Sequence, residues 1–329
     1  MRNEGSQPTL QYALGIDLGA TNARAGVIGP TGEVLHSERR ATEADRGGDY
    51  VLATLVELAA SCLSHAPVDR TVIAGIGVGS PGVIDIATGT VLKATLNIPA
   101  WSGTPLKAAL EKALSIEALV DNDANVVALG EHAFGAAVGC DDFICITLGS
   151  GVGGCIMMDG KIRRGRQRAA GHIGHVSIDS AGRMCNCGRV GCLEQYASAW
   201  AIAQRARTRV AAGDRSLIAA KAVGDPDRID AKLVFDAGRE GDPLALAIVG
   251  EVARALAQVC ADLVNLLDPE LIVIGGGVTQ AGDDLIARVR QELEVTSKVG
   301  VEPPPVVVGR LGEDAGIVGG AALVFGGFR

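Results

Sequence analysis

The chain has 329 residues, of which 48% are hydrophobic and 3% aromatic, and its formal net charge at pH 7 is −8. This length is sufficient for two domains that each bury a core. The acidic balance excludes the chain-wide basic surface that binding to nucleic acid or to an anionic membrane requires.

The N-terminal residues and the apolar stretches give no sign of a targeting or membrane segment. Residues 1–11 are polar, and the start MRNEGSQPTL lacks the apolar core of a signal peptide. No apolar stretch approaches the roughly 20 residues that a membrane helix needs. We therefore expect a loosely ordered N-terminus and a cytoplasmic protein without a membrane partner.

Three strands joined by tight turns are predicted from Tyr12 onward. The segments ALGIDLGATNARAGVIG, PTGE and VLHSERR alternate apolar strands with turn residues. Asp17 ends the first strand, and a glycine, a hydroxyl and an amide side chain follow it in the turn. A carboxylate beside such a turn suits Mg²⁺ held between protein and phosphate, although a hairpin with a polar tip has the same pattern.

A helix and a further strand extend this first layer. Residues 49–64 have the apolar spacing of a helix, and the short apolar strand TVIAGIGVG runs into an SPG turn. Strand, helix and strand in this order are typical of an α/β architecture. The next helix is expected over 104–114, with Thr104 as its N-cap and Pro105 at its first position.

The segment ALVDNDAN, residues 118–125, leads from an apolar strand into the helix VVALGEHAFG. Asp123 follows the strand directly, where α/β proteins commonly present a general base to a cleft. The alternative is that Asp123 serves as a helix N-cap, and one residue can do both.

Residues 143–157, FICITLGSGVGGCIM, repeat the form of residues 14–28, LGIDLGATNARAGVI. The two polar, glycine-rich turns DLGATN and TLGSGVGG lie at matching positions, which suggests a duplicated domain with one phosphate loop in each half. One such loop is weak evidence, and two in matching positions are considerably stronger.

Three of the eight cysteines lie close together in the middle of the chain. Cys185, Cys187 and Cys192 form C-x-C-x4-C, and the glycines between them let the backbone double back so that three thiolates reach one centre. His175 would complete a closed Cys3His site for structural Zn²⁺, with no open position for water. Disulfides or a reduced apolar core are the alternatives, but Cys185 and Cys187 are too close for an easy bridge and their neighbours are turn residues.

Beyond the cysteines, the sequence predicts helices over 198–212, 231–239 and 243–267, with a loop over 213–228. A buried strand from Glu270 then runs into a third glycine cluster, where the backbone could approach a purine or ribose closely or could pack a helix on a sheet. The last expected elements are a helix over 283–293, the strand VVVG and a final helix over 313–323.

With both turns, the SPG and NDAN segments and the CxCGxxGCxE run in this order, the sequence resembles the ROK family of sugar kinases, within the actin-like ATPase superfamily. The resemblance covers the chain from about residue 13, and the cysteine motif is its specific part. It implies a two-lobed α/β fold of the actin-like (ribonuclease H-like) class, with duplicated βββαβαβα domains and an interdomain cleft. We expect a small lobe over 1–125, completed by the helix within 313–329, and a large lobe with the zinc motif over 126–312.

The resemblance also implies ATP-dependent phosphorylation of a sugar, with Mg²⁺, a structural Zn²⁺ and Asp123 as catalytic base. The implied nucleotide and phosphate contacts are Asp17, Gly19, Thr21, Asn22, Arg24, Thr147, Gly149, Gly275, Gly276 and Gly277. The implied sugar contacts are Ser80, Gly82, Asn97, Asn122, Asp123, His172, His175 and Glu194. The implied zinc ligands are His175, Cys185, Cys187 and Cys192.

One position departs from the pattern of glucokinase-like members. Where these have Glu in ExGH, the chain reads HIGH from His172, which replaces an anionic acceptor by an imidazole that can donate or accept. The HxGH form looks like that of some bacterial N-acetylmannosamine kinases, whereas LNIPAW, NDAN and GEHAFG look like glucokinases. Glucose is therefore the predicted substrate, and N-acetylmannosamine or another N-acetylhexosamine is the alternative.

A sugar-sensing protein without catalysis is an alternative of a different class. Repressors of the family carry a helix-turn-helix segment ahead of the first phosphate turn, and the dozen or so residues here are too few for one. A sensor would also be expected to lose Asp17 or Asp123, and both are present. We expect no nucleic-acid partner and, from the resemblance, a homodimer or homotetramer.

Overall fold

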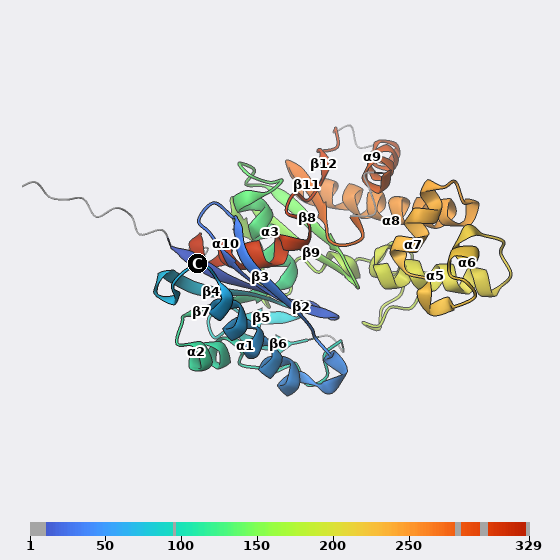
Figure 1. The fold of residues 1–329 in the computed structure, drawn as a ribbon. Coiled ribbons are helices and arrows are strands. Elements are labelled where there is room, and N and C mark those ends of the chain that lie inside the picture. The colour runs from blue at the N-terminus through green and yellow to red at the C-terminus, as the bar shows by residue number, and fades with distance from the viewer. Residues whose placement is uncertain (1–10, 95–96, 280–283, 297–301, 327–329) are drawn as a thin grey trace, which may run out of the picture. The chain divides into compact units, whose positions relative to one another are not determined.

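The computed structural model describes residues 11–94, 97–279, 284–296 and 302–326 (Figure 1). These residues group into two compact units. Unit 1 takes the residues up to Val138, Arg166–Arg168 and those from Glu313 onward, and unit 2 takes Gly139–Gly165 and Ala169–Gly312. The loosely ordered segment expected over 1–11 lies outside the described residues, apart from its last residue.

Unit 1 is built on a five-stranded sheet in the order β3-β2-β1-β4-β7. The first three strands pair antiparallel, and β1, β4 and β7 pair parallel. The strands are β1 (Tyr12–Leu18), β2 (Asn22–Ile28), β3 (Val34–Ala41), β4 (Ile73–Ser80) and β7 (Ala118–Asn122), and a separate hairpin joins β5 (Val83–Asp85) to β6 (Thr90–Lys93). The predicted three-strand meander is therefore confirmed.

The two faces of this sheet are covered differently. The helices of unit 1 are α1 (Gly48–His65), α2 (Leu106–Leu114), α3 (Asp123–Phe134) and α10 (Ala315–Phe325). Because side chains alternate along a strand, Leu14 and Ile16 of β1 point to one face, where they share an apolar core with α1 and α2. Gly15 lies between them and faces α10.

Helix α10 packs on the sheet at backbone distance. A Cβ atom at Gly15 would lie 1.7 Å from the carbonyl oxygen of Ile317, and one at Gly77 of β4 would lie 1.7 Å from the carbonyl oxygen of Gly320. Both neighbours are backbone atoms, so no side-chain rotation could make room. The absence of a side chain at these positions is therefore required by the packing of α10.

The units divide after Val138, whereas the sequence suggested a boundary at 125/126. Helix α3 runs without a break over 123–134, so a division at 125 would cut its first turn. A Cβ at Gly130 would lie 2.9 Å from the backbone nitrogen of Gly319, which shows how closely α3 and α10 pack. The structure places α10 in unit 1.

The start of α2 also differs from the expectation. Its N-cap is Pro105, and no side chain caps the helix. The carbonyl oxygen of Thr104 accepts a hydrogen bond from the amide of Val91 at 3.0 Å, so Thr104 belongs to the β6 region rather than to the helix. The first helical hydrogen bond is accepted by Pro105 from Ala109, at 3.0 Å.

Unit 2 is built on a second five-stranded sheet, in the order β10-β9-β8-β11-β12. Its strands are β8 (Phe143–Leu148), β9 (Val152–Met158), β10 (Lys161–Ile162), β11 (Leu271–Gly275) and β12 (Val306–Val308). As in unit 1, three antiparallel strands are followed by two parallel ones: β11 pairs parallel with β8, and β12 pairs parallel with β11. The predicted repeat is confirmed, with Ile16 in β1 and Ile146 in β8, and so is the α/β class of the fold.

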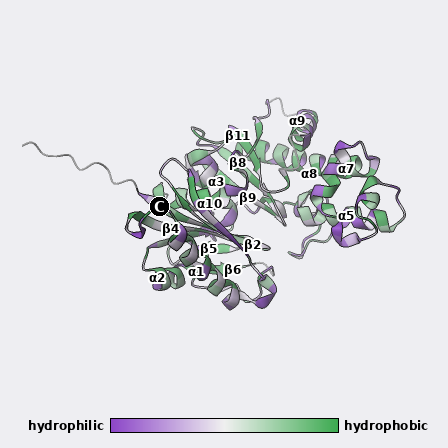
Figure 2. Ribbon diagram, viewed as in Figure 1, coloured by the Kyte–Doolittle hydropathy of each residue, from purple (hydrophilic) through white to green (hydrophobic). Residues whose placement is uncertain are grey.

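Helix α8 forms the centre of the unit 2 core, together with the mainly hydrophobic strands β8 and β11 (Figure 2). The helices of this unit are α4 (Glu194–Ala197), α5 (Ala199–Ala211), α6 (Leu217–Lys221), α7 (Ala231–Arg239), α8 (Pro243–Leu267) and α9 (Asp284–Thr296). Short 3-10 helices in the chain are η1 (Ala44–Arg46), η2 (Arg70–Val72), η3 (Ile173–His175), η4 (Pro226–Arg228) and η6 (Gly312–Asp314). The three helices predicted over 198–267 are confirmed as α5, α7 and α8.

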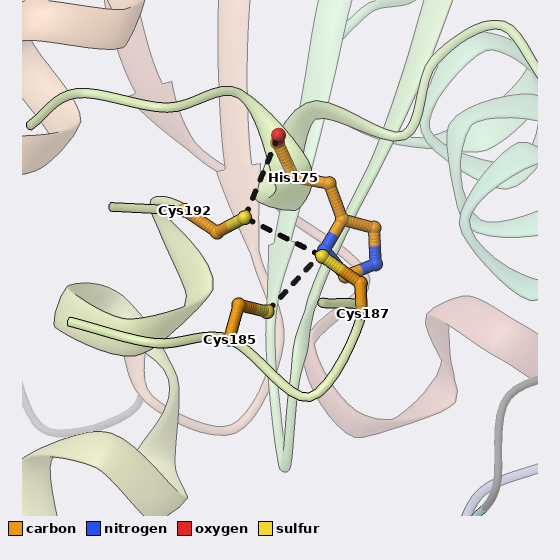
Figure 3. Close-up of side chains that lie close together, drawn as sticks. All are labelled: His175, Cys185, Cys187 and Cys192. Atoms are coloured by element: carbon orange, nitrogen blue, oxygen red, sulfur yellow. Dashed lines mark hydrogen bonds between the residues drawn. The ribbon is translucent and has the colours of Figure 1, made fainter. Parts of the chain in front are cut away.

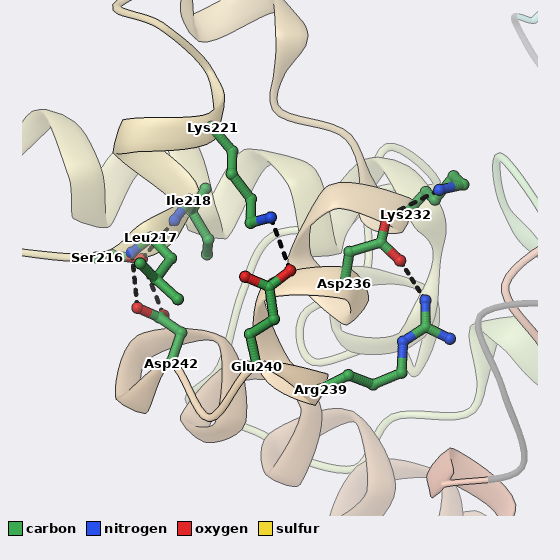
Figure 4. A network of polar contacts seen from close by, with 9 residues as sticks. All are labelled: Ser216, Leu217, Ile218, Lys221, Lys232, Asp236, Arg239, Glu240 and Asp242. Carbon is green, nitrogen blue, oxygen red and sulfur yellow. Dashed lines mark hydrogen bonds and ion pairs between the residues drawn. The ribbon is translucent and has the colours of Figure 1, made fainter.

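The segment 213–228 contains α6 and η4, so the expectation of a plain loop is wrong. The carboxylate of Asp242 accepts hydrogen bonds from the Ser216 hydroxyl at 2.9 Å and from the amide of Leu217 at 2.7 Å (Figure 4). It also accepts from the amide of Ala245 at 2.8 Å. One buried carboxylate thus caps α8 and holds the start of α6. Because this contact spans 25 residues, local composition did not reveal the helix.

Helix α8 is also long and apolar enough to cross a membrane by length and composition alone, with a mean hydropathy of 1.7 in its most apolar window. This corrects the expectation that no such stretch exists. In the structure, 67% of that window is buried, and its residues contribute to the core of unit 2. The core helix of a globular domain has the same composition.

Candidate functional site

The turn between β1 and β2 carries the first group of predicted phosphate contacts. The amide of Gly19 donates to the carbonyl oxygen of Asn22 at 3.0 Å, and the hydroxyl of Thr42 donates to the carbonyl oxygen of Gly19 at 2.7 Å. Thr21 and Asn22 are exposed. These hydrogen bonds fix the turn while leaving its tip open to a ligand.

Asp17 ends β1 beside this turn and is partly buried. Burial, and to a smaller extent the nearby Asp123, raise the pKa of its carboxyl group to about 6 against an opposing effect of Arg24. Two carboxyl groups that disfavour each other's ionisation form a place where a bound cation lowers the electrostatic energy.

The first turn of α10 lies against Asp17. A Cβ atom at Gly316 would lie 2.3 Å from the Cγ of Asp17, so only glycine leaves room for this carboxylate. Arg24 does not point to an open phosphate site: its Nη2 donates to Asp314 Oδ1 at 2.7 Å, and its Nη1 donates to the carbonyl oxygen of Glu313. In this structure Arg24 thus anchors the start of α10.

Asp123 is the first residue of α3, directly after β7. The N-cap is Asn122, whose Oδ1 accepts from the amides of Ala124 and Asn125 at 3.0 and 3.3 Å, so the N-cap interpretation of Asp123 is wrong. The Nδ2 of Asn122 donates to Asp123 Oδ1 at 2.7 Å, which leaves Oδ2 outside these contacts. Burial raises the pKa of Asp123, and hydrogen bonds from Ala124 and Asn122 oppose the rise.

The other predicted sugar contacts of unit 1 differ in accessibility. Ser80 is fully buried, and its hydroxyl accepts a hydrogen bond from the indole Nε1 of Trp101 at 3.0 Å. Gly82 has a φ of +108°, and its carbonyl oxygen accepts from Asn122 Nδ2 at 3.2 Å. Asn97 is exposed. The Ser80 hydroxyl therefore supports the segment around Trp101 and is not presented to a ligand.

In unit 2, the turn between β8 and β9 follows Thr147, whose cross-strand partners are Gly153 and Gly275. Glu194, the first residue of α4, reaches this turn: its Oε2 accepts from the amide of Val152 at 3.0 Å. A Cβ at Gly151 would lie 2.5 Å from the same oxygen, whereas one at Gly149 would meet nothing within 4 Å. A predicted sugar contact and a predicted phosphate turn are thus joined by one hydrogen bond.

The third glycine cluster lies at the end of β11. Gly276 has a φ of +94°, and a Cβ there would lie 2.5 Å from the carbonyl oxygen of Leu148. The amide of Val278 donates to that carbonyl oxygen at 3.1 Å. Gly275 is buried and Gly277 is exposed. The cluster therefore packs against the end of β8, and its outer residue is the one accessible to a ligand.

His172 directly precedes the short helix η3 and His175 is its last residue, and their ring centroids are 6.4 Å apart. His172 is an exposed residue, yet desolvation by surrounding protein atoms and the neighbouring His175 lower the pKa of its ring. At neutral pH its imidazole is therefore mainly uncharged, with one nitrogen that donates and one that accepts.

The predicted zinc ligands meet in the structure (Figure 3). The Sγ of Cys185 lies 3.8 Å from the Nδ1 of His175, the Sγ atoms of Cys187 and Cys192 lie 3.6 Å apart, and all four ligand atoms lie within 4.8 Å of one another. Tetrahedral Zn²⁺ with Zn–S bonds of about 2.3 Å and Zn–N bonds of about 2.0 Å places its ligands roughly 3.4–3.8 Å apart. Burial and the neighbouring thiols raise the pKa of Cys192 to about 12, so its thiolate form is disfavoured without a bound cation. A bound dication would offset this unfavourable energy of the thiolate. The donor set and spacing therefore fit Zn²⁺.

Residues 13–326 match the family model described as ROK family. The chain belongs to the ROK family. The glucokinase of Thermotoga maritima is 37% identical over 316 residues, 94% of this chain and 96% of that protein, and the glucokinase of Halalkalibacterium halodurans is 38% identical over 319 residues, 95% of each chain. The crystal structure of a ROK family glucokinase from Streptomyces griseus in complex with glucose and AMPPNP is 35% identical, has a TM-score of 0.85, and covers 95% of this chain and 98% of its own.

Membership of the ROK family confirms the resemblance and the actin-like class of the fold. Sequence reasoning missed Gly151 and Gly316, which leave room for two of the predicted site carboxylates, and it missed the indole of Trp101 as the partner of Ser80. For Gly316 the sequence did hold a signal, because glycine destabilises a helix and its presence in the first turn of a predicted helix indicates a close packing contact there.

Proposed function

We propose that this ROK protein is an ATP-dependent glucokinase that transfers the γ-phosphoryl group of ATP to O6 of glucose. The observation that carries the proposal is Asp123, a carboxyl group with a raised pKa that starts α3 and receives a hydrogen bond from Asn122. It occurs in a chain that is 37% and 38% identical to two glucokinases along nearly its whole length.

Asp123 is the proposed general base. A raised pKa brings the carboxylate nearer to the working pH and makes it a stronger proton acceptor. As the sugar oxygen attacks the γ-phosphorus in line, Asp123 takes the hydroxyl proton, and the bond from the γ-phosphorus to the bridging oxygen breaks to release ADP. Asn122 holds Oδ1, so Oδ2 is the oxygen that accepts the proton.

The proposed nucleotide contacts of unit 1 are Asp17 and the turn Gly19–Asn22, and those of unit 2 are Thr147, Gly149 and Gly275–Gly277. Asp17 fits Mg²⁺ because its carboxylate lies at the first turn of α10 and has its pKa raised by burial and by the neighbouring Asp123. Mg²⁺ bound with ATP would neutralise part of the negative charge on the phosphates. Arg24 enters the proposal as a support of α10.

The proposed sugar contacts are Asn97, Gly82, Asn122 and Asp123 in unit 1 and His172, His175 and Glu194 in unit 2. The other carboxylate oxygen of Glu194 would accept from sugar hydroxyls, while its Oε2 stays on the turn at Val152. A neutral His172 can accept a hydroxyl hydrogen bond or donate to an acetamido carbonyl. His172 is therefore also the observation that favours the second candidate, an N-acetylhexosamine kinase acting on a sugar such as N-acetylmannosamine.

We propose structural Zn²⁺ at His175, Cys185, Cys187 and Cys192. Cys3His supplies all four ligands of a tetrahedral site, so the bound metal holds the loop shape and leaves no position for a reacting water. The carbonyl oxygen of His175 lies 3.7 Å from Cys192 Sγ, and Cys192 is two residues before Glu194. The loop thus sets the positions of His175 and Glu194 together.

We further propose that the protein acts in the cytoplasm as a homodimer or homotetramer, without a nucleic-acid or membrane partner. Sedimentation at micromolar concentration tests the assembly, and a monomer would contradict it.

A coupled assay with ATP tests the proposed substrate on glucose, mannose, fructose, N-acetylglucosamine and N-acetylmannosamine. Glucose should give the highest kcat/KM. The same panel on His172→Glu distinguishes the two candidates. A carboxylate strengthens glucose binding by accepting from hydroxyls. An acetamido sugar that covers it would leave its charge unpaired, which costs about ten- to a hundredfold in kcat/KM. Preference of the wild type for an N-acetylated sugar would support the second candidate, and no activity on any sugar would favour a sensor.

A further inference from the structure

A further group of metal-ligating side chains lies in unit 1, away from the residues assigned so far. It consists of His36 and Glu38 on β3 and of His65, the last residue of α1. One ligand atom from each of the three lies within 4.8 Å of the others. His36 and Glu38 are two residues apart on a strand, so their side chains share a face.

Both imidazoles converge on one carboxylate oxygen. The Oε1 of Glu38 lies 3.2 Å from the Nε2 of His36 and 2.9 Å from the Nδ1 of His65. The ring centroids are 6.2 Å apart and the rings are tilted by 53°. The two nitrogens therefore approach the same carboxylate oxygen from rings of different orientation.

The next position along the same two elements is an ordinary ion pair. Arg40 lies two residues beyond Glu38 on β3, Glu57 lies two turns before His65 on α1, and Arg40 Nη1 donates to Glu57 Oε2 at 3.1 Å. At that position one cation meets one anion. At Glu38, by contrast, two imidazole nitrogens, which can be uncharged, lie next to one carboxylate oxygen. Two such nitrogens and one oxygen are suitable ligands for a metal ion.

We propose that His36, Glu38 and His65 bind a divalent transition-metal cation of the Zn²⁺, Ni²⁺ and Cu²⁺ class. Such ions form bonds of about 2.0–2.1 Å to imidazole nitrogen, which places cis ligands roughly 2.9–3.4 Å apart, and the two nitrogen–oxygen distances fall in this range. Imidazole ligands select these metals over Mg²⁺ and Ca²⁺, which take oxygen ligands. On binding, each ring carries its proton on the nitrogen that faces away from the metal.

The site is open on the side of His65. The side chain of His65 is 65% exposed, and those of His36 and Glu38 are 29% and 21% exposed. An ion can enter from solvent, and water completes its coordination. This site differs from the Cys3His group in having nitrogen and oxygen ligands and open positions, and a bound ion would join the edge strand β3 to the C-terminal end of α1.

Counting metal equivalents tests the proposal without any assumption about the cysteine site. Wild type, His65→Ala and Glu38→Gln are dialysed against Zn²⁺ or Ni²⁺, and bound metal is measured by elemental analysis. The wild type should hold one equivalent more than either variant, and its affinity for that ion should be at least about tenfold higher. Saturating Zn²⁺ should also raise the Tm of the wild type more than that of His65→Ala.

Glu57→Gln is the matched control, because it removes a carboxylate from the neighbouring ion pair on the same helix. It should bind metal like the wild type. His65 is exposed at the end of α1, and equal Tm values without added metal check that its replacement leaves the fold intact. Equal metal content in the wild type and both variants would show that His36, Glu38 and His65 form hydrogen bonds without binding a metal ion, and would overturn the proposal.

Discussion

The carboxyl group of Asp17 and the α-carbon of Gly316 are in direct contact across unit 1, so close that a methyl group at 316 would lie 2.3 Å from the Asp17 Cγ. Asp17 ends the first strand and Gly316 stands in the first turn of the last helix. The position of the proposed magnesium-binding carboxylate is therefore set by a residue almost 300 positions away in the sequence.

We expect Gly316→Ala to displace the Asp17 carboxylate, because the added methyl group overlaps it. The KM for Mg-ATP should rise and kcat should fall, together by about tenfold or more, since a misplacement of about 1 Å can cost on the order of a hundredfold. Steady-state kinetics with varied Mg-ATP measure the effect. The dissociation constant for glucose without nucleotide is the internal control and should stay unchanged; a loss of both would indicate unfolding instead.

Asp123→Asn keeps the size of the side chain and removes its basicity. The asparagine can still accept from Asn122, so the position of the side chain is retained. Turnover should fall by roughly 10²–10⁴ with little change in the KM for glucose. Kinetics at saturating substrates test this, and near-normal turnover would exclude Asp123 as the base.

The raised pKa of Asp17 predicts how the stability of the ligand-free protein depends on pH. The folded state favours the protonated carboxyl, so this contribution to the free energy of unfolding is fully present below pH 3.8 and is lost as the pH rises through about 6. Asp17→Asn should remove this dependence and exceed the wild type in stability at pH 7, by on the order of 1–3 kcal/mol.

Denaturant unfolding of the wild type and Asp17→Asn at pH 4 and pH 7, without ligands, tests this prediction. Asp45→Asn replaces an exposed carboxylate and is the control. A stability difference between wild type and Asp17→Asn that is the same at both pH values would contradict a buried, titrating Asp17.

Two glycines of one turn should behave differently when replaced by alanine. Gly151→Ala places a methyl group 2.5 Å from Glu194 Oε2 and pushes that carboxylate away, so the KM for glucose should rise by about tenfold or more. At Gly149 a Cβ meets nothing within 4 Å, so Gly149→Ala should leave the KM for glucose unchanged even if it alters that for ATP. Equal effects of the two variants on glucose would show that Glu194 does not carry the difference.

Removing the metal from the Cys3His group should weaken sugar binding before nucleotide binding. Elemental analysis should find zinc in the purified protein, and Cys187→Ala should lose it and raise the KM for glucose more than that for ATP. Cys140→Ala, which changes a cysteine outside the group, is the control. An unchanged KM for glucose in zinc-free Cys187→Ala would refute the proposed role.

The sequence predicted those parts of the fold that depend on short-range patterns. The apolar periodicity of α8 and the meander of β1, β2 and β3 are visible in any short window, and the repeat of Ile16 at Ile146 follows from comparing two such windows. Helix α6 was missed because its start is held by Asp242, far along the chain. Thr104 was misassigned for the same reason, since its carbonyl pairs with Val91 in the β6 region.

The candidate site shows the same limit. Cys185, Cys187 and Cys192 could be read from spacing alone, and the structure brings them together with His175. The ion pair of Arg24 with Asp314 spans 290 residues, and no local pattern distinguishes it from a phosphate contact. The hydroxyl of Ser80 accepts a hydrogen bond from the Trp101 indole, 21 residues away, and a motif comparison does not reveal that this hydroxyl already has a partner.

The packing of α10 has a consequence for how the chain is made. Strands β1 and β4 leave the ribosome early, but the helix that covers Gly15 and Gly77 is translated only after every residue of unit 2. Throughout that interval the sheet of the nascent first unit lacks the helix that covers Gly15 and Gly77, while unit 2 has all of its own strands and can fold first. Unit 1 therefore contains the strands that are made first but completes its folding last. We expect chaperone contacts during translation to concentrate on unit 1.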